Sequence, residues 1–151
     1  LTQVSGRAGR FSSGGKVIIQ TYRPDNYAIT CAAANDEAGF YSRELSFRAG
    51  MGFPPFSRLF RFVFRSKDRV KAEKAINEFA GHLRAVSDGS LRIMGPAEAP
   101  ISVLSDNYRY QLVVNTSDFS SAHRILVSSA ASLRLPSGVY MESDVDPVSL
   151  M

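Results

Sequence analysis

The chain has few of the residues that build metal sites, disulfides or membrane spans, and each scarcity removes a class of function. Its one cysteine, Cys31, rules out an internal disulfide and a multi-cysteine zinc site within these 151 residues. Only two histidines, His82 and His123, remain for metal chemistry. The longest apolar runs have the length of a β-strand and fall far short of the roughly 20 residues that span a bilayer. We therefore expect no bound metal, no membrane partner and a cytoplasmic location.

Neither sign of charge dominates the sequence. Lysine and arginine together number 18 and aspartate and glutamate 14, which gives a net charge of +4. This small excess permits a nucleic-acid partner but does not require one. A hydrophobic fraction of 44% and a charged fraction of 21% are typical of a globular chain and argue against extensive disorder.

A break rich in glycine and proline divides the chain. Gly50, Gly52, Pro54 and Pro55 fall within six residues, a composition that ends any helix and predicts a domain boundary. Before the break, residues 16–22 have the short β-branched pattern of a buried strand, whereas residues 27–34 and 36–48 favour helices. The two predicted domains are residues 1–51 and 52–151.

The hydrophobic pattern after the break predicts six elements. Strands are expected at residues 56–66, 91–94, 108–116 and 139–145, and helices at residues 70–86 and about 119–133. The order β-α-β-β-α-β is the ferredoxin-like arrangement. The predicted fold class is therefore α/β (α+β), with two helices on one face of a four-stranded antiparallel sheet.

Several side chains in these elements have expected structural roles. Asp68 and Asp118 are suited to cap the two helices, and Val70 and Phe79 are expected on the buried face of the first. Glu98 lies in a predicted loop at residues 95–100. Other expectations are a helical ion pair between Glu44 and Arg48, a buried Cys31, and an anchoring role for Asp144 and Asp146 near the last strand.

The string Gln3-Val4-Ser5-Gly6-Arg7-Ala8-Gly9-Arg10 is the most specific in the chain. It resembles the last motif of superfamily 2 helicases, Q-x-x-G-R-x-G-R. Nucleotide hydrolysis needs positive charge beside the γ-phosphate, which the planar fork of arginine supplies. Glycine residues allow the backbone to approach the nucleotide closely.

The resemblance continues along the chain and identifies one family of these helicases. The sequence is similar to the PriA family of primosomal replication-restart DNA helicases in six further strings. They are the strand Gly15 to Tyr22, the E-x-x-x-R of Glu44 and Arg48, Pro54-Pro55, Gly95-Pro96-Ala97-Glu98-Ala99-Pro100, Tyr108-Arg109-Tyr110-Gln111-Leu112, and Asp144-Val145-Asp146-Pro147.

The resemblance implies an ATP-dependent 3′–5′ DNA helicase that recognises abandoned forks and D-loops and starts primosome assembly. Its implied partners are branched and single-stranded DNA, single-strand-binding protein and other primosome proteins. Arg7 and Arg10 are the implied catalytic arginine fingers, and Gln3, Gly6 and Gly9 the implied ATP contacts. Residues 1–51 correspond to the end of the second helicase lobe, and residues 52–151 to the C-terminal domain that contacts DNA or a protein partner.

The chain starts at Leu1 rather than methionine and is expected to be a fragment of a longer protein. It contains neither a G-x-x-x-x-G-K-[ST] phosphate loop nor a D-E-x-H motif nor the paired C-x-x-C clusters of the family's zinc module. ATP, magnesium and zinc are therefore expected in the parent protein only. The fragment alone should neither hydrolyse ATP nor bind zinc.

The case for DNA binding that rests on residue types comes from one basic stretch. Between Arg58 and Lys74 there are seven basic and two acidic residues, with aromatic residues interleaved. This pattern suits phosphate contacts combined with base stacking, although a solvated sheet edge guarded by charge would look the same. Candidate DNA-binding residues are Arg58, Arg61, Arg65, Lys67 and Arg109. Without the helicase resemblance, the fold would also suit a freestanding nucleic-acid-binding or ligand-sensing module without ATPase activity.

Overall fold

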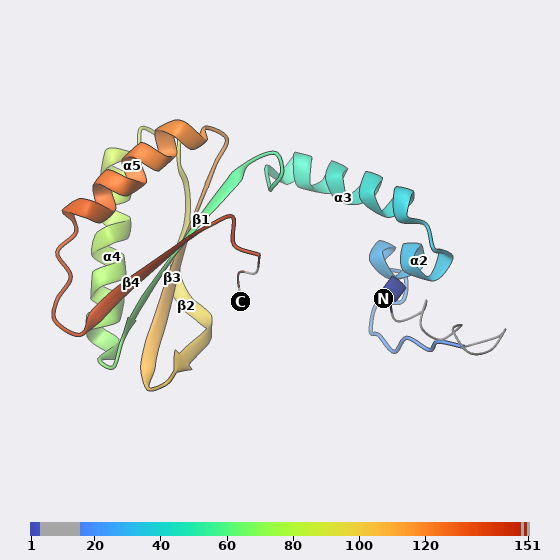
Figure 1. Ribbon diagram of the computed structural model, residues 1–151, viewed down its shortest axis with the longest axis horizontal. Helices are drawn as coiled ribbons and strands as arrows, with labels where there is room; N and C mark the ends of the chain where they lie inside the picture. Colours follow the sequence, from blue (N-terminus) through green and yellow to red (C-terminus); the bar gives the residue numbers. More distant parts are fainter. Residues whose placement is uncertain (4–15, 149, 151) are drawn as a thin grey trace. The chain divides into compact units, whose positions relative to one another are not determined.

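The structure is a computed structural model that describes residues 1–3, 16–148 and 150 of the chain (Figure 1). The chain forms two compact units, Leu1–Met51 and Gly52–Met151. Within the described residues, no helix is both long and apolar enough to cross a membrane.

The first unit contains the helices α2 (Tyr27–Ala34) and α3 (Glu37–Met51), which confirms the two helices predicted there. Short polar side chains define their ends. The Asn26 side chain accepts a hydrogen bond from the Ala28 N–H at the start of α2, and Asn35 ends α2 in the left-handed conformation with φ of 54°. The Asp36 carboxylate accepts from the Gly39 N–H at 2.8 Å and so begins α3.

The strand predicted for residues 16–22 is wrong. These residues are irregular and exposed; Ile18 is 83% exposed and Tyr22 fully so. A strand is stable only when a neighbouring strand pairs with its backbone groups, and residues 1–3 and 16–51 contain no other strand. The β-branched pattern of the segment is therefore not sufficient to form a strand in this unit.

The second unit is a ferredoxin-like domain, as predicted. Its four strands are β1 (Arg58–Ser66), β2 (Arg92–Leu104), β3 (Asn107–Thr116) and β4 (Val139–Val145), in the sheet order β2-β3-β1-β4 with every pair antiparallel. The helices α4 (Arg69–Val86) and α5 (Phe119–Ser132) cover one face of this sheet (Figure 1).

Aromatic side chains fill the space between the sheet and α4. Phe60, Phe62 and Phe64 alternate along β1 and belong to the same buried cluster as Phe79 of α4. The Phe79 ring lies 5.0 Å from Phe62 in an edge-to-face arrangement and 5.5 Å from Phe64. The side chains that alternate along β1 therefore pack in one core with those that recur at helical spacing on α4.

The predicted helix caps are confirmed. The Asp68 carboxylate accepts from the Lys71 N–H at 3.2 Å, and that of Asp118 from the Ser121 N–H at 3.1 Å. The buried position predicted for Val70 is wrong, because its side chain is 71% exposed. Val70 precedes the buried Ala72 by two residues, which places it about 200° around the helix from the buried face.

The second strand is longer than predicted. Strand β2 continues from Arg92 through the expected loop to Leu104, and Glu98 lies within it rather than in a loop. Its register against β3 shifts between Met94 and Ala97 and again between Glu98 and Val103. Such bulges absorb the extra residues around Gly95 and Pro96 while the pairing resumes beyond them.

Candidate nucleic-acid interface

The face of the sheet opposite the helices carries three of the predicted DNA-binding residues. Side chains on a strand alternate between faces, and the phenylalanines of β1 face the helices, so Arg61 and Arg65 lie on the opposite face. The antiparallel register pairs Arg65 with Arg109 of β3, which places Arg109 on that face too. We call these three residues the arginine face.

Strand β4 supplies carboxylates to the same face. Register pairs Arg61 with Asp144 and Arg65 with Tyr140. Arg61 lies 3.6 Å from Asp144, whereas Arg65 forms a 2.6 Å ion pair with Glu142. The Glu142 and Asp144 side chains are about half exposed, whereas the Arg61 side chain is only 18% exposed. The more exposed pair, Arg65 with Glu142, contributes only about 0–1 kcal/mol.

Arg109 is held differently from its two neighbours. One of its terminal nitrogens donates to the Ile101 carbonyl oxygen of β2 at 3.3 Å. This hydrogen bond uses one N–H of the guanidinium, and its acceptor is a neutral carbonyl group rather than a carboxylate. The arginine face therefore combines three guanidinium groups with two carboxylates that solvent reaches.

The remaining predicted DNA contacts lie elsewhere. Arg58 forms a 2.5 Å ion pair with Asp146, and its guanidinium sits 4.7 Å above the Phe119 ring of α5. The Asp146 carboxylate also accepts from the Leu59 N–H at 3.0 Å, which confirms its anchoring role and gives Arg58 a structural one. Lys67 is exposed just beyond the end of β1.

Most of the predicted nucleotide contacts lie outside the described residues, namely Gly6, Arg7, Gly9 and Arg10. Gln3 is described, and it is helical and exposed.

The predicted pair of Glu44 and Arg48 is confirmed at 2.6 Å, and the Tyr27 hydroxyl also donates to Glu44. The hydrogen bond from Tyr27, followed by that from Arg48, holds the pKa of Glu44 below its usual value. The same bond to Glu44 raises the pKa of Tyr27. These contacts join α2 to α3, and Cys31 is buried nearby in the same unit, as expected.

The described residues contain no group of three histidine, cysteine, aspartate or glutamate side chains close enough to bind a metal ion. These described residues therefore do not fit a zinc site.

Sequence reasoning missed Tyr140 and Glu142 as neighbours of Arg65 on the arginine face. Tyr140 and Glu142 lie next to Arg65 only because β4 pairs with β1, two strands separated by more than 70 residues in sequence. The wrong boundary for β2 likewise hid the ion pair between Arg69 and Glu98 at 2.7 Å.

Residues 49–148 match the family described as the primosomal protein N C-terminal domain. The whole chain is 41% identical to the replication restart protein PriA of Treponema pallidum and 34% identical to that of Borreliella burgdorferi. Over 76% of the chain, the identity to the replication restart protein PriA of Bacillus subtilis is 39%. The chain spans 23% of the length of the first two proteins and 14% of the third.

Proposed function

The chain belongs to the family of primosomal protein N C-terminal domains, and on this premise we propose that residues 52–151 contact DNA in a replication-restart helicase. The whole protein would be an ATP-dependent 3′–5′ DNA helicase that recognises stalled or abandoned forks and D-loops and starts primosome assembly. Its further partners would be single-strand-binding protein and other primosome proteins in the cytoplasm. The names of the relatives, replication restart protein, support this assignment.

The observation that supports DNA contact is the gathering of Arg61, Arg65 and Arg109 on the helix-free face of the sheet. Guanidinium groups bind phosphate oxygens with two parallel hydrogen bonds. The ion pair between Arg65 and Glu142 is weak because both side chains are partly exposed to solvent, so a phosphate would replace this carboxylate at small cost. Arg61 is only 18% exposed, so a phosphate would reach it from the side of the half-exposed Asp144. The sheet face would thus offer phosphate contacts at Arg65 and Arg109, and at the part of Arg61 that solvent reaches.

A salt series tests this proposal. The affinity of the chain for fluorescent forked DNA is measured by anisotropy, with the triple variant Arg61→Gln, Arg65→Gln, Arg109→Gln as comparison. Each lost phosphate contact should lower the log–log salt slope by about 0.7–0.9, so the triple variant should lose about 2–3 units. The control is Arg124→Gln, which removes one positive charge from the exposed surface of α5 and should leave the slope unchanged. Equal slopes for the chain and the triple variant would remove the arginine face from DNA binding.

We propose a separate role in ATP turnover for the first unit. Residues 1–51 would be the end of the second helicase lobe, with Arg7 and Arg10 as arginine fingers and Gln3, Gly6 and Gly9 beside the nucleotide and its magnesium ion. The support is the Q-x-x-G-R-x-G-R string. In the complete protein, Arg7→Ala or Arg10→Ala should lower ATP turnover by about 1000-fold or more and leave DNA affinity unchanged. Arg23→Gln is the control, and normal turnover in both alanine variants would exclude the role.

A further inference from the structure

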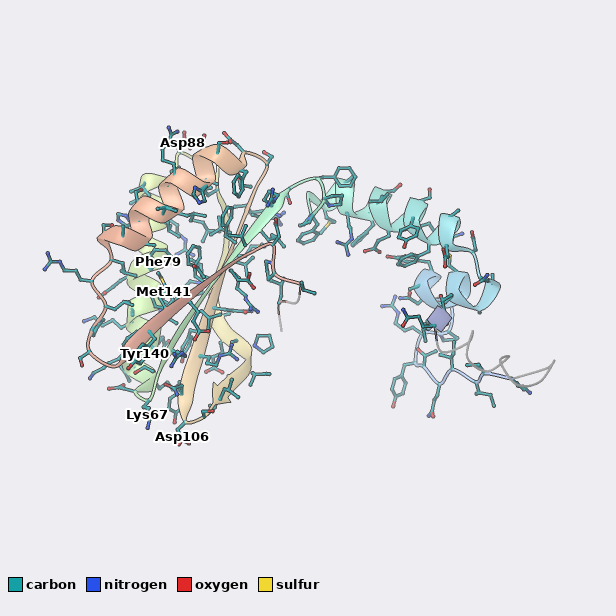
Figure 2. All side chains as sticks on the ribbon, in the orientation of Figure 1. Lys67, Phe79, Asp88, Asp106, Tyr140 and Met141 are labelled. Atoms are coloured by element: carbon teal, nitrogen blue, oxygen red, sulfur yellow. The ribbon has the colours of Figure 1, made fainter. Side chains whose placement is uncertain are left out.

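A hollow of about 570 Å³ opens at the end of the sheet where β1 finishes. Four segments form it: the end of β1 with the first turn of α4, the start of β3 at Asn107, the turn at residues 137–138, and the start of β4. Figure 2 shows two of its lining residues, Lys67 and Tyr140, at this same end of the domain.

The charged groups around this hollow are mainly basic. Arg65, Lys67 and Lys71 line it, together with a single carboxylate from Asp68. That carboxylate already caps α4 through the Lys71 N–H and lies 4.0 Å from Lys71 Nζ. Lys67 is exposed and forms no ion pair with another described residue. Arg65 is paired with Glu142 and Lys71 lies beside Asp68, so Lys67 supplies the net positive charge that a phosphate would meet here.

Tyr140 adds an aromatic surface to the same hollow. Its ring lies 4.6 Å from the guanidinium carbon of Arg65, which covers one of its faces. The residue is nevertheless 54% exposed, so much of the ring remains open to a ligand. An exposed tyrosine leaves apolar ring surface in contact with water, and stacking of a planar ligand would remove that surface from water.

From this combination we infer that the hollow binds one nucleotide of single-stranded DNA. The base stacks on Tyr140, and its phosphate is held by Lys67 and Lys71. The inference rests on the proposed DNA-binding function and names a second subsite, which shares Arg65 with the arginine face. Duplex DNA does not fit this arrangement because its bases are already stacked on each other.

An acidic peptide would also be attracted to the basic groups, but the aromatic ring favours the nucleotide. Stacking on tyrosine needs a planar partner, which every base supplies and a carboxylate side chain does not. Only a ligand that carries both a phosphate and a base can contact the basic groups and the tyrosine ring at the same time.

The absence of tryptophan from the chain allows a direct test. The variant Tyr140→Trp carries a single indole fluorophore in the hollow, and Val86→Trp carries one at the far end of α4, where residue 86 is 46% exposed. A single-stranded oligonucleotide should quench the fluorescence of the Tyr140→Trp variant but not that of the Val86→Trp variant. An oligonucleotide with abasic sites should bind without this quenching, because it has phosphates but no bases to stack.

Affinity measurements on the full chain complete the test. Tyr140→Leu should weaken single-strand binding about tenfold, whereas Tyr140→Phe, which keeps the ring, should bind within about twofold of the unchanged chain. Lys67→Gln and Lys71→Gln should each lower the salt slope by about 0.7 for a single strand.

The outcomes separate this inference from the proposed function. If single-stranded DNA binds with a normal salt slope but leaves the Tyr140→Trp fluorescence unquenched, and Tyr140→Leu binds normally, the nucleotide site is excluded and the arginine face stands. If no DNA binds at low salt, the proposed function fails as well. Quenching of the Tyr140→Trp variant by an aspartate-rich peptide and not by the oligonucleotide would show that the hollow is a peptide site, against the inference.

Discussion

Asp146 joins the two ends of the second unit through its carboxylate and its backbone. The carboxylate accepts from Arg58 Nε and from the Leu59 N–H, while the Asp146 N–H donates to the Leu59 carbonyl oxygen at 2.7 Å. Its φ of 50° turns the chain out of β4 at this point. Asp146, the residue after β4, thus holds the start of β1 in place.

We expect Asp146→Ala to destabilise the chain by about 1–2 kcal/mol, because the Leu59 N–H and the Arg58 guanidinium lose a shared acceptor. Asp146→Asn should cost less, since its amide oxygen still accepts from Leu59. The free energy of unfolding in urea measures both effects. Asp106→Asn, in the exposed turn between β2 and β3, is the control and should leave the stability unchanged. A stability for Asp146→Ala equal to that of the control would contradict the anchoring role.

Single residues were predictable where the contact is local in sequence. Asp68 and Asp118 cap helices three residues away, and Glu44 pairs with Arg48 one helical turn away. Contacts across the sheet were not predictable in the same way. The neighbours of Arg65 are set by strand register and by the position of β4, which no pattern within β1 contains.

Helix α4 shows how an element is fixed by its buried face. Phe79 is fully buried on it and touches two phenylalanines of β1. We expect Phe79→Ala to destabilise the domain by about 3–5 kcal/mol through lost burial and an unfilled cavity. Phe79→Leu should destabilise the domain clearly less, because leucine fills part of the cavity. Thermal unfolding followed by circular dichroism measures the difference in stability. A loss of stability below about 1 kcal/mol for the alanine variant would contradict this core arrangement.

The pairing of α2 with α3 should depend on pH through Glu44. Because its pKa is lowered in the folded chain, first by Tyr27 and then by Arg48, the ionised carboxylate favours the folded state. This contribution is present above the unfolded pKa of about 4.3 and is lost as pH falls through the lower folded value. An NMR titration of the α2 and α3 amides should show this loss, and Glu44→Gln should remove it. Identical titrations of the two proteins would exclude Glu44 as the cause.

Elements with strong periodicity were predicted well, and the errors have physical causes. The segment at residues 16–22 has strand-forming residues but lacks a pairing strand among the described residues of its unit. In β2, bulges near Gly95 interrupt the alternation on which strand prediction depends. Local pattern therefore identified the elements, whereas pairing determined how far they extend.

At the scale of the whole molecule, the second unit contains a complete core of its own. Its buried cluster draws on β1, β3, β4 and both helices, and Ile93 of β2 packs against it. The Gly52 carbonyl oxygen accepts hydrogen bonds from the side chains of Asn115 and Ser57. The first residue of the unit is therefore bonded to the rest of the domain.

We expect a chain of residues 52–151 to fold alone, with a midpoint of thermal unfolding within about 2 °C of that of the domain in the full chain. Calorimetry on both proteins measures this, and a fall of more than about 10 °C would show that the first unit is needed for stability.

The central claim is that DNA contacts the helix-free sheet face and the basic hollow at its end. Chemical-shift mapping of the backbone amides during titration with forked DNA tests it most directly. The predicted result is a set of shifts in β1, β3 and β4 around Arg61, Arg65 and Arg109, and around Lys67 and Tyr140, with α5 unchanged. Shifts confined to the outer surfaces of α4 and α5, with none on the sheet face, would contradict the account.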